Sequence, residues 1–231
     1  MIEISLGRLS LMFLPLLVVG WVMMRWSGGV KELCLATVRM VGQLLVMGYL
    51  LVKLFEGDRS WVTGLVVLFM FVVSAVIAVR TIRVQKLRAF KDALLAIGVG
   101  GGLVFLLVIF GVLEGGRNFS AQFVVPMAGM IFANAMTAVT LSAERFEAEV
   151  NNGQDFLQAR QTAWNASLIP QINSFLAVGL VSLPGMMTGQ ILTGTSPLDA
   201  VRYQILVMAM VLGSAGISVA IFLQQLYRKS E

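Results

Sequence analysis

Long stretches without a charged residue constrain the fold of this chain more than any other feature. No charge occurs in residues 9–24, and none occurs again between Gln161 and Leu198. A helix needs roughly 20 apolar residues to cross the hydrocarbon core of a bilayer. Only 13% of the 231 residues are charged, whereas about 25% are charged in an ordinary soluble domain. One soluble domain could not bury so much apolar surface, so we predict an all-α integral membrane protein.

The apolar runs predict seven membrane-spanning helices within a single transmembrane domain over residues 1–231. The predicted spans are residues 4–24, 40–52, 61–79, 93–113, 118–143, 168–190 and 203–226. Pro184 and Gly185 lie inside the sixth span. Proline removes a backbone donor and glycine loosens the turn, so the helix should break or kink there. The break could line a cavity, or it could be a simple kink.

The distribution of Lys and Arg predicts the orientation. Five cations crowd the connection between the third and fourth spans, namely Arg80, Arg83, Lys86, Arg88 and Lys91. Cytoplasmic loops carry such an excess. Alternate threading then places 12 of the 17 cations inside, with the N-terminus outside and the C-terminus in the cytoplasm. This bias accounts for the net charge of +5, so we expect no nucleic-acid partner. We expect the spans to be surrounded by membrane lipid.

The composition also excludes several kinds of chemistry. There is no histidine, and Cys34 is the single cysteine, so histidine bases, disulfides and cysteine clusters are ruled out. The sequence has no G-x-x-x-x-G-K-[ST] loop and no carboxylate deep within a predicted span. We therefore expect a protein that is not an enzyme, that binds no cofactor and that has no nucleotide-binding motif of its own.

Neutral polar residues remain inside the membrane and are the candidates for a translocation path. Amides and hydroxyls in hydrocarbon need partners, which either neighbouring helices or a wet path can supply. The candidates are Gln43, Asn134, Ser182, Met186, Thr188 and Gln190. If the path passes the predicted break, Gly185 is expected to occupy space where only a hydrogen is tolerated. Small residues at Gly98, Gly102 and 213–218 are expected to pack helices closely.

The connection at 142–167 is long, acidic and able to form helix with apolar positions such as Phe146 and Trp164. An amphipathic helix beside the membrane would suit docking to a partner subunit, and the alternative is an extension of the flanking helices. The candidates for coupling to such a partner are Glu147, Glu149, Gly153, Asp155 and Arg160.

Three segments resemble the Fet-type ABC transporter permeases, bacterial proteins described as iron exporters that have plant relatives linked to aluminium tolerance. These segments are VRMVGQLLVMGYLL, PMAGMIFANAM and VSLPGMMTGQILTGTSPLDAVRYQI. The positions that carry the resemblance are Arg39, Gln43, Tyr49, Pro126, Asn134, Pro184, Gly185, Met186, Thr188, Gly189, Gln190, Pro197 and Gln204. In addition, the residues from Glu147 to Gly153 approximate the EAA-x-x-x-G loop of ABC importer permeases, with Glu149 in place of the second alanine.

The resemblance implies a multi-pass subunit of the bacterial cytoplasmic membrane that exports iron or another metal. It would work as a homodimer with a separate cytoplasmic ATPase subunit, and that subunit would use the ATP. No metal ligands can be assigned, because the membrane interior offers amides, hydroxyls, carbonyls and methionine rather than the usual ligands of iron. The alternative is a stand-alone secondary transporter or channel for a small polar solute, and ATP dependence distinguishes the two.

Overall fold

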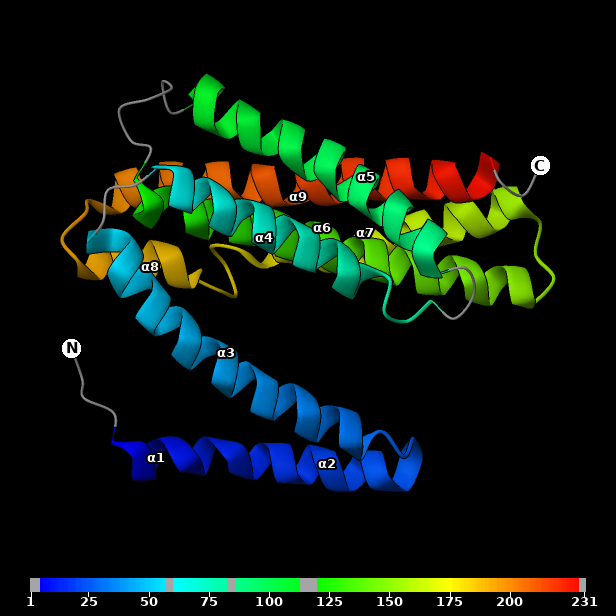
Figure 1. The fold of residues 1–231 in the computed structure, drawn as a ribbon, viewed down its shortest axis with the longest axis horizontal. Coiled ribbons are helices and arrows are strands. Elements are labelled where there is room, and N and C mark those ends of the chain that lie inside the picture. The colour runs from blue at the N-terminus through cyan, green and yellow to red at the C-terminus, as the bar shows by residue number, and fades with distance from the viewer. Residues whose placement is uncertain (1–4, 57–59, 83–85, 113–119, 229–231) are drawn as a thin grey trace. The chain divides into compact units, whose positions relative to one another are not determined.

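The computed structural model describes residues 5–56, 60–82, 86–112 and 120–228, and these residues are helical without a strand (Figure 1). The prediction of an all-α membrane protein is confirmed. The chain divides into two units, residues 1–57 and residues 58–231.

The first unit is a pair of long apolar helices. One arm consists of α1 (Leu6–Ser10), the 3-10 turn η1 (Leu11–Phe13) and α2 (Leu14–Trp26). The other arm is α3 (Val30–Glu56). Gly28 joins them with a φ of +71°, a left-handed conformation that glycine adopts without steric cost. The Gly28 amide closes the turn by donating to the Met23 carbonyl over 2.8 Å.

The second unit is a bundle around two central helices. In chain order it contains α4 (Ser60–Ala78), α5 (Lys86–Leu106) with its π-helical continuation η2 (Leu107–Val112), α6 (Ala121–Asn151), α7 (Phe156–Ala177), α8 (Gly185–Leu192) and α9 (Pro197–Arg228). Helix α6 packs against α4, α5, α7 and α9, and α9 also contacts α5, α7 and α8. The fully buried side chains include Ile97, Met127, Ile131 and Phe222, so the core lies where α5, α6 and α9 meet.

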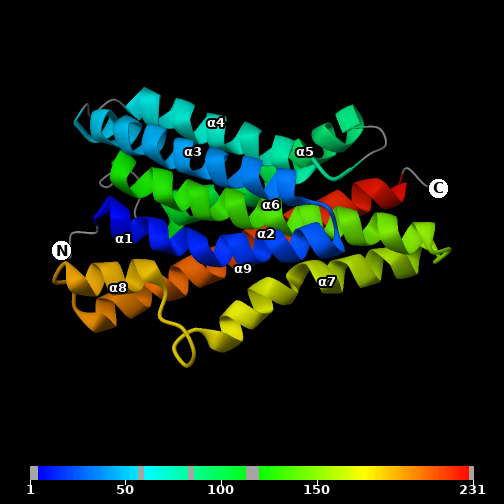
Figure 2. The same cartoon turned by 90° about the horizontal axis from the view of Figure 1, so that it is seen from below.

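Six helical segments of the described chain are long and apolar enough to cross a membrane. They correspond to every predicted span except residues 168–190. There the chain forms α7, a turn over residues 178–184, and α8. Helix α7 begins where α6 ends, and α8 lies at the opposite end of the bundle beside the start of α9 (Figures 1 and 2). The predicted sixth span is therefore an interrupted helix that follows the length of the bundle.

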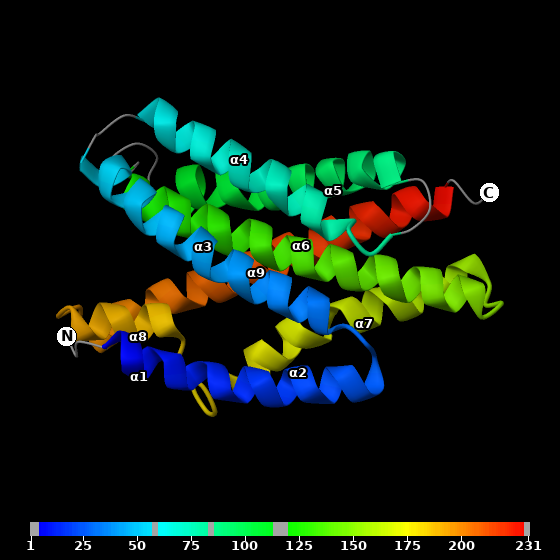
Figure 3. The same cartoon turned by 60° about the horizontal axis from the view of Figure 1, so that its bottom comes forward.

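The cations of the second unit gather at one end, where α4, α6 and α9 end and α5 and α7 begin (Figures 1 and 3). We call this the cationic end; its described residues are Arg80, Lys86, Arg88, Lys91, Arg145, Arg160 and Arg228. At the opposite end, the described part of the unit carries Arg202. Arg59, Arg83 and Arg117 lie outside the described residues.

Helices α5 and α9 approach most closely at Gly100. A Cβ added to Gly100 would lie 2.6 Å from the Ser218 amide nitrogen and 2.9 Å from its Cα. Gly98 instead faces the ring of Phe71, and Gly102 has no atom within 4 Å of an added Cβ. The observed contact therefore lies at Gly100, two residues from each member of the expected Gly98 and Gly102 pair.

Candidate functional site

The candidate site is the interruption between α7 and α8. Helix α7 ends at Ala177, whose carbonyl accepts hydrogen bonds from the Val181 amide at 2.8 Å and from the Ser182 amide at 3.2 Å. Gly179 turns the chain with a φ of +82° and donates its amide to the Ser182 carbonyl over 2.9 Å. The turn thus satisfies many of its own backbone groups, which a helix break in a membrane requires.

Pro184 marks the start of α8 rather than the end of α7. It is the N-cap residue of α8, with a φ of −61° and a ψ of 140°. Its carbonyl accepts the Thr188 amide over 3.1 Å. The Thr188 hydroxyl donates to the Gly185 carbonyl over 2.9 Å. The predicted break is confirmed, although it opens at Val178, six residues before the proline.

Gly185 does not fill the role expected from the sequence. No atom lies within 4 Å of a Cβ added to Gly185. The expectation that only a hydrogen is tolerated there is therefore wrong within this chain, because the space around an added Cβ is open.

Gln190 of α8 has a side-chain oxygen that lacks a hydrogen-bond partner among the described residues. This oxygen, Oε1, is buried. A buried polar atom without a partner costs roughly 1–3 kcal/mol and calls for an explanation. Met186, on the same short helix, is half-buried and packs against the core. Helix α8 therefore places an amide oxygen, a thioether and the Thr188 hydroxyl beside α9.

The other path candidates lie elsewhere. Ser182 is exposed in the turn. Asn134 lies on α6, where its Nδ2 donates to the Met130 carbonyl over 2.8 Å, so this donor is engaged within its own helix. Gln43 is an exposed residue of α3, in the first unit. The structure thus groups Met186, Thr188 and Gln190 on one helix, with Ser182 in the turn before it.

An apolar cavity of about 380 Å³ adjoins the interruption, bounded by the end of α7, the turn, α8 and α9. Its described lining is apolar apart from Gln204, which is buried. Gln204 is one of the positions that carry the family resemblance. It follows that part of the segment VSLPGMMTGQIL and the start of α9 enclose a single space.

The structure also reveals buried polar atoms that sequence reasoning missed. The Gln171 Oε1 of α7, the Tyr203 hydroxyl of α9 and the Ser218 Oγ of α9 lack partners within the described part of the chain. Tyr203 packs edge-on against Phe123, with ring centroids 5.5 Å apart. Gln171 lies inside the long uncharged run and could have been selected by the same criterion as Gln190. Tyr203 is the first residue of the predicted span 203–226, and the sequence held no signal for its burial.

The segment at 142–167 is a helical hairpin rather than a separate amphipathic helix. Helix α6 continues to Asn151, and α7 starts at Phe156. Gly153 forms the turn with a φ of +83°. The rings of Phe146 and Phe156 stack across the hairpin with centroids 6.3 Å apart. The structure therefore agrees with the alternative in which the flanking helices extend beyond the spans.

The coupling candidates differ in their surroundings. Glu149 is only 5% exposed and forms an ion pair with Arg145 over 2.5 Å. Glu147 is half-buried, and Gly153 and Asp155 are exposed. Arg160 donates from Nη1 to the Gln224 Oε1 of α9 over 2.9 Å. A partner could reach Glu147, Gly153 and Asp155, whereas Glu149 faces the interior.

In the described residues, no group of three His, Cys, Asp or Glu side chains could hold a metal ion. The fold and the site define a multi-pass, all-α membrane protein with an interrupted helix that carries neutral polar groups.

Comparison with known proteins identifies the family. Residues 6–230 match the uncharacterised protein family UPF0014, and the chain belongs to this family. The probable iron export permease protein FetB of Escherichia coli is 35% identical over 214 residues, which cover 86% of this chain and 81% of FetB. The UPF0014 membrane protein slr1647 of Synechocystis is 32% identical over 219 residues, covering 88% and 81%.

A plant protein shares the similarity. The Arabidopsis thaliana protein ALUMINUM SENSITIVE 3 is 32% identical over 191 residues, which cover 76% of this chain and 68% of the plant protein. No solved structure matches the chain. The resemblance to the Fet-type permeases is thereby confirmed.

Proposed function

We propose that this chain is the membrane-spanning permease subunit of an ABC transporter that exports iron or another metal cation. The observation that carries the proposal is the 35% identity to a protein named as a probable iron export permease. Because the sequence has no nucleotide-binding loop, a separate cytoplasmic ATPase subunit would supply the energy. Two copies of the chain would pair with two such subunits in the bacterial cytoplasmic membrane.

The interrupted helix supports a path beside α8. Broken membrane helices expose backbone and polar groups only where these line a cavity or meet protein. The Gln190 oxygen, the Met186 thioether and the carbonyls of the turn would offer a cation weak oxygen and sulfur ligands. An exporter benefits from such weak ligands, because its cargo must leave the protein again.

The hairpin between α6 and α7 would receive the ATPase. It lies at the cationic end, which the excess of Lys and Arg would place in the cytoplasm, where ATP is available. Because α7 continues from the hairpin to the interruption, a displacement of the hairpin would reach the proposed path through one helix.

Everted membrane vesicles test this proposal. Vesicles carrying the chain and its co-purifying ATPase should accumulate ferrous iron when ATP is added, and vesicles lacking either protein should not. Accumulation without the ATPase, driven by a proton gradient or by diffusion, would contradict the proposal and indicate a secondary transporter or channel.

A substitution at Gln190 tests the path within the same assay. Replacing this unpartnered amide with a similarly sized apolar group should leave the stability of the protein unchanged or raise it, so Gln190→Leu should not reduce protein abundance. It should reduce transport per inserted molecule, because the proposed path loses the amide oxygen. Gln225 provides the matched control, since its Oε1 is also buried without a described partner but lies near the opposite end of α9. Normal transport by Gln190→Leu, or an equal loss in Gln225→Leu, would remove α8 from the path.

A further inference from the structure

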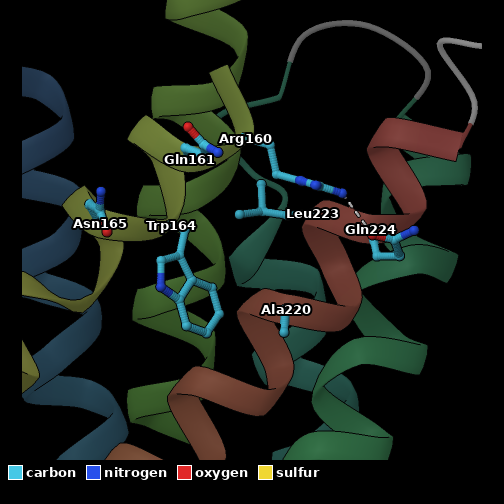
Figure 4. Close-up of a pocket in the computed structure, with 7 residues that line it drawn as sticks. All are labelled: Arg160, Gln161, Trp164, Asn165, Ala220, Leu223 and Gln224. Atoms are coloured by element: carbon cyan, nitrogen blue, oxygen red, sulfur yellow. Dashed lines mark hydrogen bonds between the residues drawn. The ribbon is translucent and has the colours of Figure 1, made fainter. Parts of the chain in front are cut away.

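A second cavity, of about 400 Å³, lies between α7 and α9 at the cationic end. Its wall includes Arg160, Gln161, Trp164 and Asn165 of α7 together with Leu223 and Gln224 of α9 (Figure 4). Its size falls within the roughly 300–1,000 Å³ of small-ligand pockets. We call it the α7–α9 pocket.

The α7–α9 pocket is polar on one side and apolar on the other. The Arg160 guanidinium reaches across to Gln224 and donates to its Oε1 over 2.9 Å, while the Trp164 ring and Ala220 lie away from this bond (Figure 4). Trp164 is half-buried and packs against the core. Among the described residues that line the pocket, none is acidic. The pocket therefore offers a cation and several amide donors.

The α7–α9 pocket lies at the edge of two predicted membrane spans. Gln224 is two residues before the end of the predicted span 203–226, and Asn165 is three residues before the start of the predicted span 168–190. Arginine and tryptophan are the residues that membrane proteins place at this level.

One exposed stripe of residues on α7 changes from polar to apolar with distance from the pocket. Gln161 and Asn165 are followed at helical spacing by Ile169, Ile172 and Leu176, and all five are exposed. Residues three, four and seven positions apart share a helix face. The stripe is polar at the cationic end and apolar toward the middle of the bundle, which is the polarity of an amphiphile with its headgroup at the pocket.

We propose that the α7–α9 pocket binds the phosphate of an anionic phospholipid headgroup, with an acyl chain along the apolar part of the α7 stripe. The planar guanidinium suits the paired oxygens of a phosphate. Basic pockets between membrane helices on the cytoplasmic side recognise anionic headgroups in this way. A water-soluble protein partner would leave the apolar stripe unused, and a free phosphate would leave it uncovered.

Native mass spectrometry of the full-length chain tests the proposal without an ATPase, so its outcome is separate from that of the transport assay. The chain is incubated in detergent with equal amounts of phosphatidylglycerol and phosphatidylcholine. The wild type should retain phosphatidylglycerol preferentially. Arg160→Gln should lower that preference about tenfold, because charge-assisted hydrogen bonds to the phosphate are lost. Arg160→Lys, which keeps the charge but loses the planar guanidinium, should lower the preference less.

Arg202→Gln is the matched control, because this exposed arginine lies at the opposite end of the bundle and bonds the Asp199 side chain. It should keep the wild-type preference. Asn165→Leu changes an exposed position of the pocket and should weaken the preference even if Arg160→Gln fails to fold.

Four results would overturn the proposal. The preference could survive in Arg160→Gln and Asn165→Leu, or it could fall equally in Arg202→Gln. Millimolar inorganic phosphate could displace the lipid completely, which would make the pocket a site for free anions. Finally, the variants could lose association with the ATPase while retaining phosphatidylglycerol, which would make the pocket a protein-docking surface.

Discussion

Acidic residues that look alike in the sequence have different roles in the structure. Glu147 and Glu149 both belong to the acidic connection and both were candidates for docking a partner. Glu149 is buried against Arg145, one helical turn earlier, whereas Glu147 is half-buried. A buried carboxylate depends on its partner for stability, because removing one member leaves an uncompensated charge. Substitution of Glu149 therefore tests the stability of the hairpin, and substitution of Glu147 tests the docking of a partner.

Charge reversal at each glutamate should separate the stability of the hairpin from its docking to the ATPase. Glu149→Lys would place a second cation beside Arg145 in a buried position, so we expect a loss of folded protein, measured as the yield and melting temperature of the purified chain. Glu147→Lys should leave both unchanged and reduce co-purification of the ATPase. If Glu149→Lys folds normally, the ion pair is not structural; if Glu147→Lys binds the ATPase normally, the docking surface lies elsewhere.

The sequence could predict which residue types enter the site, but it could not predict their partners. Gln190 and Asn134 were equivalent candidates, since each is an amide in an apolar run. In the structure Asn134 donates to the carbonyl of Met130, whereas the Gln190 oxygen is buried without a described partner. This difference depends on side-chain direction and on the neighbouring helix, and neither property is encoded by position along one helix.

At the level of elements, the interrupted helix was predictable but its boundaries were not. Pro184 indicated a break because it lacks an amide hydrogen. The helix nevertheless ends earlier, because Gly179 adopts a left-handed conformation and the Ala177 carbonyl accepts the amides of the turn. Proline is well suited to the start of a helix, where its missing donor costs nothing. Pro184 accordingly initiates α8.

The contact between α5 and α9 gives a prediction at the same level. An alanine at Gly100 would bring its Cβ to 2.6 Å from the Ser218 amide nitrogen, and backbone atoms cannot yield as a flexible side chain can. Gly100→Ala should therefore destabilise the chain by about 1–3 kcal/mol, the usual cost of overpacking. The measurement is thermal unfolding in detergent.

Gly102 supplies the control, because an added Cβ there meets no atom within 4 Å and alanine has the higher helix propensity. Gly102→Ala should unfold at the wild-type temperature or slightly above it. Equal destabilisation by the two variants would show that the α5–α9 contact does not depend on Gly100.

At the scale of the whole molecule, hydropathy was sufficient to predict the class of fold. Uncharged runs located the six long apolar segments, and the interrupted pair α7 and α8 accounts for the predicted sixth span. Composition could not predict that α6 and α9 form the centre of the second unit, since all the spans are similarly apolar. Their central place depends on small buried residues such as Ala135, Ala138 and Ala215, which allow neighbouring helices to approach closely.

The ends of the bundle give the last prediction, which concerns topology. Helix α9 ends at the cationic end, and the α5–η2 helix ends at the opposite end (Figure 1). A reporter fused after Lys229 and a reporter inserted at Gly115 should therefore lie on opposite sides of the membrane, although both positions are outside the described residues. From the excess of Lys and Arg at the cationic end, we expect the Lys229 reporter to lie in the cytoplasm.

Green fluorescent protein, which fluoresces when it remains inside the cell, and alkaline phosphatase, which is active when exported, measure the two sides. We expect fluorescence from the Lys229 fusion and phosphatase activity from the Gly115 fusion. Replacing Arg80, Lys86, Arg88 and Lys91 together with glutamine should increase the fraction of chains in the reverse orientation, because these cations supply most of the bias around α4 and α5. Both reporters on one side would contradict the bundle, whereas exchanged sides would contradict only the assignment of the cationic end to the cytoplasm.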